Sequence, residues 1–254
     1  MQKSVVKKCL NKTVLQIIAV ICMAIDHVSI FAANIYLYYV MKFFGRITII
    51  VMCYFVAEGY YKTRNLNRYI IRLGIFAAIS QVPYYLYKFS ANLPNSCTSL
   101  IISMFMNRNV IFTLFVGLSL LVIIKSDYSI IVKAVAAGAA LWLVRCSDWG
   151  FYAVLWIVGF GVFRDSKKQQ CKWLMAVLAL KILTVAATVM MYVVQTGMLP
   201  YSMICGVMTY FGGFLALPLI SLYNGEKGKG PKWGFYIFYP AHLIIITIVY
   251  MLMS

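Results

Sequence analysis

Long apolar segments recur along the chain from residue 14 to residue 253 and are separated only by short polar connections. A helix needs about 20 predominantly apolar residues to cross a bilayer. Lipid tolerates only helices and closed barrels, because every backbone polar group must be satisfied internally. The pattern predicts an all-α fold, a polytopic bundle of transmembrane helices that forms a single integral membrane domain over residues 1–254.

Hydropathy divides this bundle into nine expected spans of unequal length. They cover approximately residues 14–35, 40–61, 69–88, 109–124, 130–145, 149–163, 173–195, 201–223 and 234–253. The three middle spans are short, since sixteen helical residues rise only about 24 Å. We expect these three to thin the bilayer locally or to line a polar cavity.

Composition supports a membrane protein and argues against other classes. The chain is 63% hydrophobic and 11% charged, whereas a soluble domain has about 25% charged residues. The net charge of +17 would suggest a nucleic-acid partner in a soluble protein. Here lysines and arginines gather in alternate connections, which the positive-inside rule explains. We therefore expect a cytoplasmic N-terminus, an external C-terminus, the lipid bilayer as partner and no nucleic acid. The seven cysteines show no zinc-binding spacing, so neither a metal nor a disulfide framework is predicted.

Asp26 and His27 are adjacent polar residues inside the first span. A charged side chain at the centre of a membrane helix costs about 2.5–3.5 kcal/mol on insertion scales, so such residues usually mark function. Gln16 precedes His27 by eleven residues and shares its helix face. The alternative interpretation is structural: Asp26 caps a connection or pairs with Arg46, and His27 is a satisfied core residue.

The second span and the connection after it carry further charges. Glu58 is either an interfacial partner of Lys62, four residues later, or a carboxylate that serves a cofactor or a proton. The arginines that follow are spaced by four, which predicts one basic helical side; they are Arg64, Arg68 and Arg72. This side is either a positive-inside anchor or a cytoplasmic clamp for the phosphates of an anionic cofactor.

Four polar residues fall near later apolar segments. Gln81 and a nearby proline interrupt the third span, so the amide is expected to face the interior. Asn109 either caps the fourth span or frames an external opening. Asp148 is expected to cap the sixth span. His242 follows Pro240 and lies about 13 Å along the last span, near mid-bilayer.

Five stretches of the sequence resemble the TraX family of membrane proteins, named for F-pilin acetylation. The matching stretches are IAVICMAIDHV, FGRITIIVMCYFVAEGYYKTRNLNRYIIRLGIFAAISQVPYYL, NVIFTLFVGL, DWGFYAVLWIV and FYPAHL. The plan is also similar to that of the acyltransferase-3 membrane enzymes. In that group a buried histidine of the first helix follows a basic residue by eleven positions. His27 matches the histidine, whereas Gln16 departs from the basic residue, and Gln81 stands where the resemblance leads us to expect a glutamate.

The resemblance implies an acyltransferase in the bacterial inner membrane. The acyl group, which is acetyl in the family's prototype, would come from cytoplasmic acetyl-CoA. The acceptor would be an amine or hydroxyl of an extracytoplasmic molecule. On this hypothesis His27 is the general base and Asp26 or a nearby group orients it. The donor-binding residues are Glu58, Lys62, Arg64, Arg68 and Arg72. The residues expected to line the cavity are Arg46, Gln81, Asn109, Asp148 and His242. A small-solute transporter or channel, and an assembly factor without catalytic activity, are the alternatives.

Overall fold

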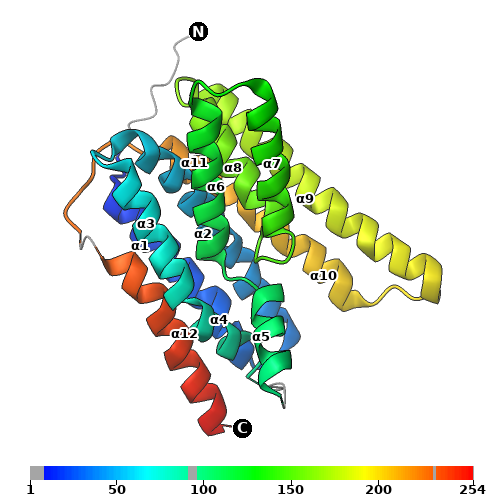
Figure 1. Ribbon diagram of the computed structural model, residues 1–254. Coiled ribbons are helices and arrows are strands. Elements are labelled where there is room, and N and C mark those ends of the chain that lie inside the picture. The colour runs from blue at the N-terminus through cyan, green and yellow to red at the C-terminus, as the bar shows by residue number, and fades with distance from the viewer. Residues whose placement is uncertain (1–8, 91–95, 231–232, 254) are drawn as a thin grey trace. The chain divides into compact units, whose positions relative to one another are not determined.

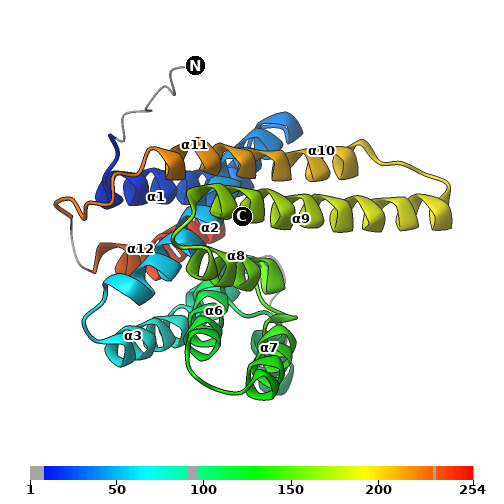
Figure 2. The same cartoon turned by 90° about the horizontal axis from the view of Figure 1, so that it is seen from above.

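The computed structural model describes residues 9–90, 96–230 and 233–253, and Figures 1 and 2 show their ribbon. Within these ranges the structure contains helices, two isolated β-bridges and no strand, which confirms the predicted all-α class. Each predicted apolar segment is helical, with ends shifted by a few residues. The elements are α1 (Lys12–Val28), η1 (Ser29–Phe31), α2 (Ile35–Lys62), α3 (Leu66–Ile79), α4 (Gln81–Lys88), α5 (Cys97–Met106), α6 (Val110–Lys125), α7 (Ile130–Val144), α8 (Gly150–Val162), α9 (Lys167–Thr196), α10 (Tyr201–Thr209), η2 (Tyr210–Leu215), α11 (Ala216–Ser221) and α12 (Gly234–Met253).

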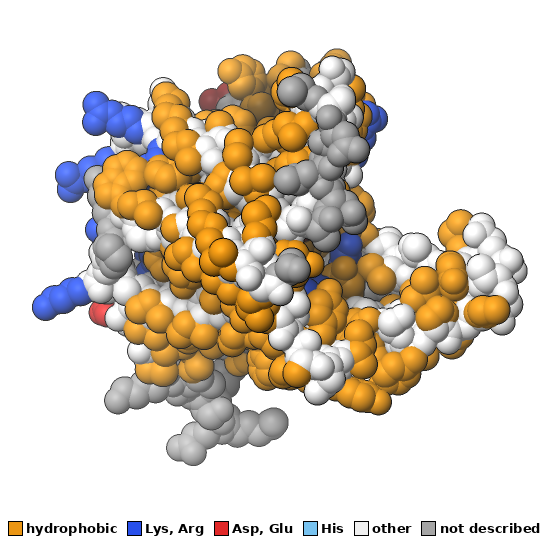
Figure 3. All heavy atoms as spheres, turned by 90° about the horizontal axis from the view of Figure 1, so that it is seen from below, with side chains coloured by type: hydrophobic (Ala, Val, Ile, Leu, Met, Phe, Trp, Pro, Cys, Tyr) orange, Lys and Arg blue, Asp and Glu red, His pale blue; other side chains and the backbone are white. Residues whose placement is uncertain are grey.

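Among the residues that the structure describes, five segments are long and apolar enough to cross a membrane. They are Lys12–Phe31, Ile35–Lys62, Lys167–Thr196, Tyr201–Ser221 and Gly234–Met253. The helices α6, α7 and α8 are apolar but shorter, as the hydropathy pattern predicts. Hydrophobic side chains cover most of the face shown in Figure 3, while lysines and arginines lie at its margins. The exposed apolar surface is typical of helices that contact lipid.

The described residues form two compact units. Unit 1 comprises those of Met1–Met52 and Lys167–Lys232, and unit 2 those of Cys53–Ser166 and Trp233–Ser254. Unit 1 thus contains α1, the first part of α2, and α9 to α11. Unit 2 contains the last part of α2, α3 to α8, and α12.

In unit 1, α1 packs against the first part of α2. The side chain of Asn11 caps α1 by accepting a hydrogen bond from the backbone N–H of Val14. Leu15 and Ala19 lie on the buried face of α1. The Thr48 hydroxyl on α2 donates to the Ala19 carbonyl oxygen at 2.9 Å. This side-chain bond ties the two helices together at a point where each also buries apolar residues.

The last apolar segment of unit 1 changes its winding in the middle. α10 gives way at Tyr210 to the 3₁₀ segment η2, and α11 follows. Gly212 lies within η2, so close to α2 that a Cβ there would collide with the carbonyl oxygen of Phe43. Glycine permits this backbone-to-backbone approach because it has no side chain. Figure 2 shows α9 running beside α10, and α9 also packs on η2.

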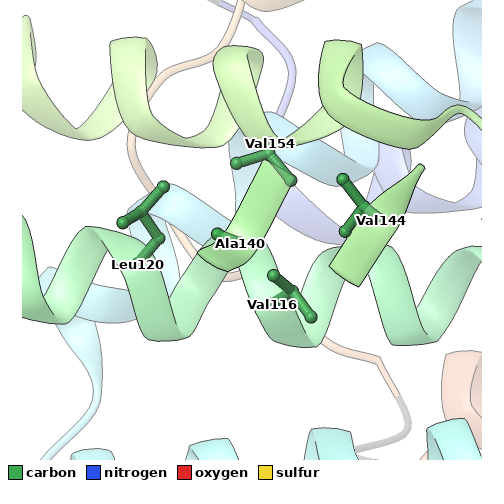
Figure 4. Packing of buried hydrophobic residues seen from close by; sticks show 5 residues of the cluster. All are labelled: Val116, Leu120, Ala140, Val144 and Val154. Carbon is green, nitrogen blue, oxygen red and sulfur yellow. The ribbon is translucent and has the colours of Figure 1, made fainter. Parts of the chain in front are cut away.

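In unit 2, α6 is the central helix and packs against α3, α7 and α8. One core cluster joins three of these helices (Figure 4): Val116 and Leu120 from α6, Ala140 and Val144 from α7, and Val154 from α8. The core of unit 2 is therefore built on the short apolar helices. Their tight mutual packing fixes the ends of α6 and α8, where several candidate site residues lie.

The predicted interruption at Gln81 is confirmed. α3 ends at Ile79 and α4 begins at Gln81, with Pro83 in the first turn of α4, where a missing backbone N–H costs little. The prediction that Arg64 shares a helical side with the later arginines is wrong. Asn65 caps α3 by accepting from the backbone N–H of Arg68, so Arg64 precedes the helix.

Candidate functional site

Asp26, near the end of α1, forms an ion pair with α2 within unit 1. Lys42 Nζ lies 3.2 Å from Asp26 Oδ2 and donates to the Asp26 carbonyl oxygen at 2.9 Å. The second carboxylate oxygen, Oδ1, is buried against Gly45, has no hydrogen-bond partner and leaves no room for a Cβ there. The alternative interpretation in which Asp26 pairs with Arg46 is therefore wrong. Because α2 begins shortly after α1 and turns back along it, Asp26 comes level with an early turn of α2.

His27 is held by the backbone of its own helix. Its Nδ1 lies 2.8 Å from the carbonyl oxygen of Met23. A carbonyl oxygen can only accept a hydrogen bond, so Nδ1 carries the hydrogen and the lone pair of the neutral ring lies on Nε2. The side chain is half-buried. An imidazole oriented in this way has the tautomer that a general base needs, with the basic nitrogen at the outer edge of the ring.

Arg46 lies one turn after Lys42 on α2 and contacts the 3₁₀ segment of unit 1. Its guanidinium carbon is 4.7 Å from the centre of the Tyr210 ring, and Nη2 donates to the hydroxyl of Thr209 at 3.4 Å. Lys181 of α9 approaches the same ring, with Nζ 5.2 Å from its centre. Three apolar segments thus bring two cations to one tyrosine.

Gln81 and Asn109 meet in unit 2, at the start of α4 and the start of α6. Gln81 Nε2 donates to the carbonyl oxygens of Met104 and Asn107, at 3.0 and 2.7 Å. Gln81 Oε1 accepts from both the backbone N–H and the side-chain amide of Asn109, at 3.1 and 2.8 Å. The interior placement predicted for Gln81 is confirmed, and the geometry is that of a saturated structural network.

Asn109 also caps α6, which confirms one of the two alternatives for it. Its Oδ1 accepts from the backbone N–H of Phe112 at 3.1 Å, and its Nδ2 donates to the Ala77 carbonyl oxygen at 2.7 Å. The residue is fully buried, at 0% exposure. A fully buried amide with all its hydrogen bonds committed is suited to holding α3, α4 and α6 together rather than to binding a ligand.

The predicted capping of α8 by Asp148 is wrong. Trp149 occupies the cap position in the left-handed region, at φ 60°, without a side-chain capping bond. The backbone of Asp148 instead joins the start of α6: its N–H donates to the Arg108 carbonyl oxygen, and its carbonyl oxygen accepts from the Thr113 hydroxyl. These bonds hold the connection before α8 in a turn that moves the helix start beyond Asp148. They also bring Asp148 into the neighbourhood of Asn109.

His242 lies on α12 of unit 2 and repeats the backbone contact of His27. Its Nδ1 lies 2.8 Å from the Phe238 carbonyl oxygen, so Nδ1 again carries the hydrogen. The ring stacks on Phe238 with centroids 4.6 Å apart and meets the edge of Tyr239. His242 is only 7% exposed. Pro240 has no backbone N–H, so the helix is missing one hydrogen bond beside this histidine.

The donor-binding candidates of unit 2 separate into different environments. Glu58 pairs with Lys62 at 2.8 Å across one helical turn, which confirms that pairing. Arg64 and Arg68 are exposed. Arg72 is half-buried and lies 5.2–5.6 Å from three ring centres, those of Tyr69 on α3, Trp233 just before α12 and Tyr236 on α12.

Lys181 is the residue that sequence reasoning missed. A signal for it is present, because Lys181 is the only charged residue in the stretch from 173 to 225. In the part of the chain that the structure describes, no group of three or more His, Cys, Asp or Glu side chains is arranged to hold a metal ion.

Sequence comparison identifies a family and a curated relative. The family model described as TraX protein matches residues 11–250. The chain belongs to the TraX family. A TraX-like relative in Dichelobacter nodosus, named probable fimbrial assembly protein FimC, serogroup H1, is 30% identical over 239 residues, covering 91% of this chain and 92% of the relative. No solved structure matches the chain. This match confirms the resemblance to the TraX family that the five sequence stretches indicated, including those that contain Asp26–His27 and AEGYYKTRN.

Proposed function

We propose that this TraX family member is a membrane-bound acetyltransferase that uses acetyl-CoA and acts on an amine or hydroxyl of an extracytoplasmic acceptor. The observation that carries the proposal is His27, an ionisable residue in a span-length apolar helix whose neutral ring has its lone pair on Nε2. Family membership supports the proposal, since the family takes its name from pilin acetylation.

The proposal includes a topology. The chain forms one membrane domain of nine spans in the bacterial inner membrane, with the N-terminus in the cytoplasm and the C-terminus outside. The alternation of basic connections supports this orientation. In this topology the basic residues that end α2 and begin α3 face the cytoplasm, where acetyl-CoA is available.

In the proposed reaction His27 acts as the general base. Nε2 takes the proton of the acceptor amine or hydroxyl while that nitrogen or oxygen attacks the thioester carbonyl carbon. The tetrahedral intermediate collapses, the carbon–sulfur bond breaks, and the coenzyme A thiolate leaves and receives the proton from His27. The Met23 carbonyl oxygen keeps the ring in the required tautomer, and Asp26, held by Lys42, fixes the neighbouring turn of α1. Proton transfer of this kind contributes about 100- to 10,000-fold to a rate.

We assign the remaining candidates by their surroundings. Lys62, Arg64 and Arg68 are exposed and suit the phosphates of coenzyme A. Glu58 positions Lys62, and Arg72 holds α3 to the aromatic residues at the start of α12. Gln81, Asn109 and Asp148 form the rigid frame of unit 2. Arg46 lines the reaction region of unit 1, and His242 is a buried, stacked residue of unit 2. The reaction as proposed needs no metal.

The test is acyl transfer by purified full-length protein. Protein in detergent is incubated with radiolabelled acetyl-CoA and a membrane extract, and both coenzyme A release and label on the extract are followed. We expect turnover by the wild type that is lost in His27→Ala. The matched control is Gln16→Ala, which removes a half-buried polar side chain from the same stripe of α1. Full turnover by a properly folded His27→Ala protein would refute the mechanism.

A second candidate function is assembly of an envelope filament without catalysis. The name of the Dichelobacter nodosus relative, a probable fimbrial assembly protein, favours it. An assembly factor would bind its partner equally well with or without His27. The same assay of wild type, His27→Ala and Gln16→Ala distinguishes the two functions. An enzyme forms acetylated product that is lost in His27→Ala, whereas an assembly factor forms no product in any variant.

A further inference from the structure

Aromatic rings from two segments of unit 2 surround Arg72 of α3. Its guanidinium carbon lies 5.4 Å from the ring centre of Trp233, just before α12, and 5.2 Å from that of Tyr236 on α12. Tyr69, on α3 itself, is 5.6 Å away. The ring centre of Phe76, one turn further along α3, lies 4.9 Å from that of Tyr236 and 6.1 Å from that of Trp233. Because a cation is attracted to the face of an aromatic ring, these contacts hold the side chains, here called the aromatic cluster, in one arrangement.

Trp233 is the most accessible member of the aromatic cluster. It is 46% exposed, whereas Tyr69 is 9% exposed. The contacts with Arg72 and with the Phe76 ring hold the indole in place, so its exposed part is a flat aromatic surface of fixed position. A surface of this kind is suited to stacking against a planar group of a ligand.

An exposed indole beside an arginine also has a simpler interpretation, that of the aromatic belt at a membrane interface. Trp142 on α7 fits that interpretation, since it is 58% exposed and has the guanidinium carbon of Arg145 4.7 Å from its ring centre. Trp233 differs from Trp142 because its arginine also contacts two tyrosine rings. The surroundings of Trp233 therefore require more than the belt to explain them.

Exposed cations border the aromatic cluster on two helices. Arg68 is exposed and precedes Arg72 by one turn of α3, about 6 Å along the helix. The end of α2 reaches the cluster at Gly59, where a Cβ would lie 2.8 Å from the Tyr69 ring. Lys62 follows Gly59 by less than one turn, and its side chain is 45% exposed. Guanidinium and ammonium groups with access to solvent are suited to binding phosphate.

We propose that the adenine base of coenzyme A stacks on the exposed part of Trp233, while Arg68 and Lys62 bind phosphates of the same nucleotide. An adenine nucleotide joins a flat π surface to several negative charges, and the aromatic cluster with its bordering cations offers a partner to both. The headgroup of an acidic phospholipid has the charge but no ring to stack. The inference rests on the proposed function in one respect only, namely that the donor is acetyl-CoA.

The affinity for coenzyme A is the measurement that tests the stacking site. Binding to purified full-length protein in detergent is followed by titration calorimetry for the wild type, Trp233→Leu and Trp142→Leu. Loss of one base–aromatic stack lowers affinity at least about fivefold, and we expect that loss in Trp233→Leu. Trp142→Leu is the matched control, since it removes an exposed, arginine-stacked tryptophan from the same unit. Its affinity should equal that of the wild type.

Two further variants separate stacking from folding and from charge. Trp233→Phe keeps an aromatic ring and should bind coenzyme A within about threefold of the wild type. Arg68→Gln removes an exposed phosphate partner and should weaken binding about two- to fivefold, because solvent screens exposed ion pairs.

The source of the nucleotide is identified with ATP, which carries adenine but neither the 3′-phosphate nor the pantetheine arm of coenzyme A. A site for the donor binds coenzyme A more tightly than ATP. Equal affinities that both fall in Trp233→Leu would support adenine stacking and overturn the assignment to the donor.

The proposal is overturned if Trp233→Leu binds coenzyme A as tightly as Trp142→Leu does, or if Trp233→Phe loses as much affinity as Trp233→Leu. Acetyl-CoA turnover together with either result would refute the stacking site and leave the acetyltransferase intact. Coenzyme A binding that depends on Trp233, without acetyl transfer by the wild type, would support the site and refute the acetyltransferase.

Discussion

Unit 2 contains side-chain amides whose hydrogen bonds are satisfied within the protein, whereas the apolar segments of unit 1 contain half-buried charged side chains. Gln81 uses both amide hydrogens and both acceptor positions on groups of unit 2. In unit 1, Asp26 matches Lys42, and Arg46 and Lys181 share one aromatic ring. A saturated neutral network contributes to rigidity. Half-buried charges inside apolar segments contribute little to stability and are better explained by function.

The two histidines show the same contrast on a smaller scale. Both direct Nδ1 at the carbonyl oxygen four residues earlier, so both have the same tautomer. His242 is 7% exposed and stacked on Phe238, whereas His27 is half-buried beside an ion pair. Because identical backbone contacts hold them, the surroundings rather than the tautomer distinguish a structural histidine from a candidate base.

The largest expected effect is on catalysis by His27. We expect His27→Ala to lower the rate of acetyl transfer by about 100- to 10,000-fold, because no other group replaces the base. Its thermal unfolding midpoint should change less than that of His242→Ala, which removes a buried, stacked ring. Initial rates and unfolding of both variants in the same detergent check this. If His27→Ala is the less stable of the two, our distinction between the histidines is wrong.

The next effect concerns the stability of unit 2. Asn109→Ala leaves Gln81 Oε1 with only the backbone N–H of residue 109 as donor, removes the side-chain donor to the Ala77 carbonyl oxygen and removes the cap of α6. The combined cost is about 2–4 kcal/mol. Denaturation followed by circular dichroism measures it, with Asn67→Ala on the exposed side of α3 as control. A loss below about 0.5 kcal/mol, close to the error of such measurements, would mean that the network is not structural.

Hydropathy could predict the helices, because lipid selects local runs of apolar residues and the runs are visible without knowledge of packing. The break at Gln81 and the pairing of Glu58 with Lys62 are also local, since both involve residues within one or two turns. The winding change at Tyr210 was not predicted. It depends on the approach of Gly212 to Phe43, 169 residues away in the chain, a contact that no local pattern reports.

The candidate site was predictable only in part. The position of His27 in a span follows from composition, but its tautomer follows from the contact with Met23. The partner of Asp26 depends on how α2 is rotated about its axis, so Lys42 and Arg46 were equally available from sequence. The turn before α8 is set by hydrogen bonds to α6 and to the residue before it, and for this reason Asp148 does not occupy the N-cap of α8. Lys181 was overlooked although it stands alone in a long apolar stretch.

A smaller effect on stability is expected at Gly212, where η2 approaches the backbone of α2 closely. Gly212→Ala places a Cβ on the Phe43 carbonyl oxygen, whereas Gly206→Ala, on α10 of the same segment, meets nothing within 4 Å. Overpacking costs about 1–3 kcal/mol, while alanine in an open helical position adds up to about 1 kcal/mol of stability over glycine. Unfolding of the two variants should therefore shift in opposite directions. Equal shifts would mean that α2 and η2 are not in contact in the membrane protein.

The smallest expected effect on stability is that of Glu58→Gln in unit 2. Glu58 pairs with Lys62, and the side chains are 14% and 45% exposed, so solvent screens the lysine end of the pair. We expect a loss of at most about 0.5 kcal/mol in the free energy of unfolding, and the same for Lys62→Met. Acetyl-CoA affinity is the informative measurement, since a charge that holds the donor-binding lysine acts on affinity rather than on stability. Weaker binding at unchanged stability would assign this pair of unit 2 to function. Unchanged acetyl-CoA affinity would mean that Glu58 and Lys62 form a structural ion pair, and that the charges of unit 1 are the functional ones.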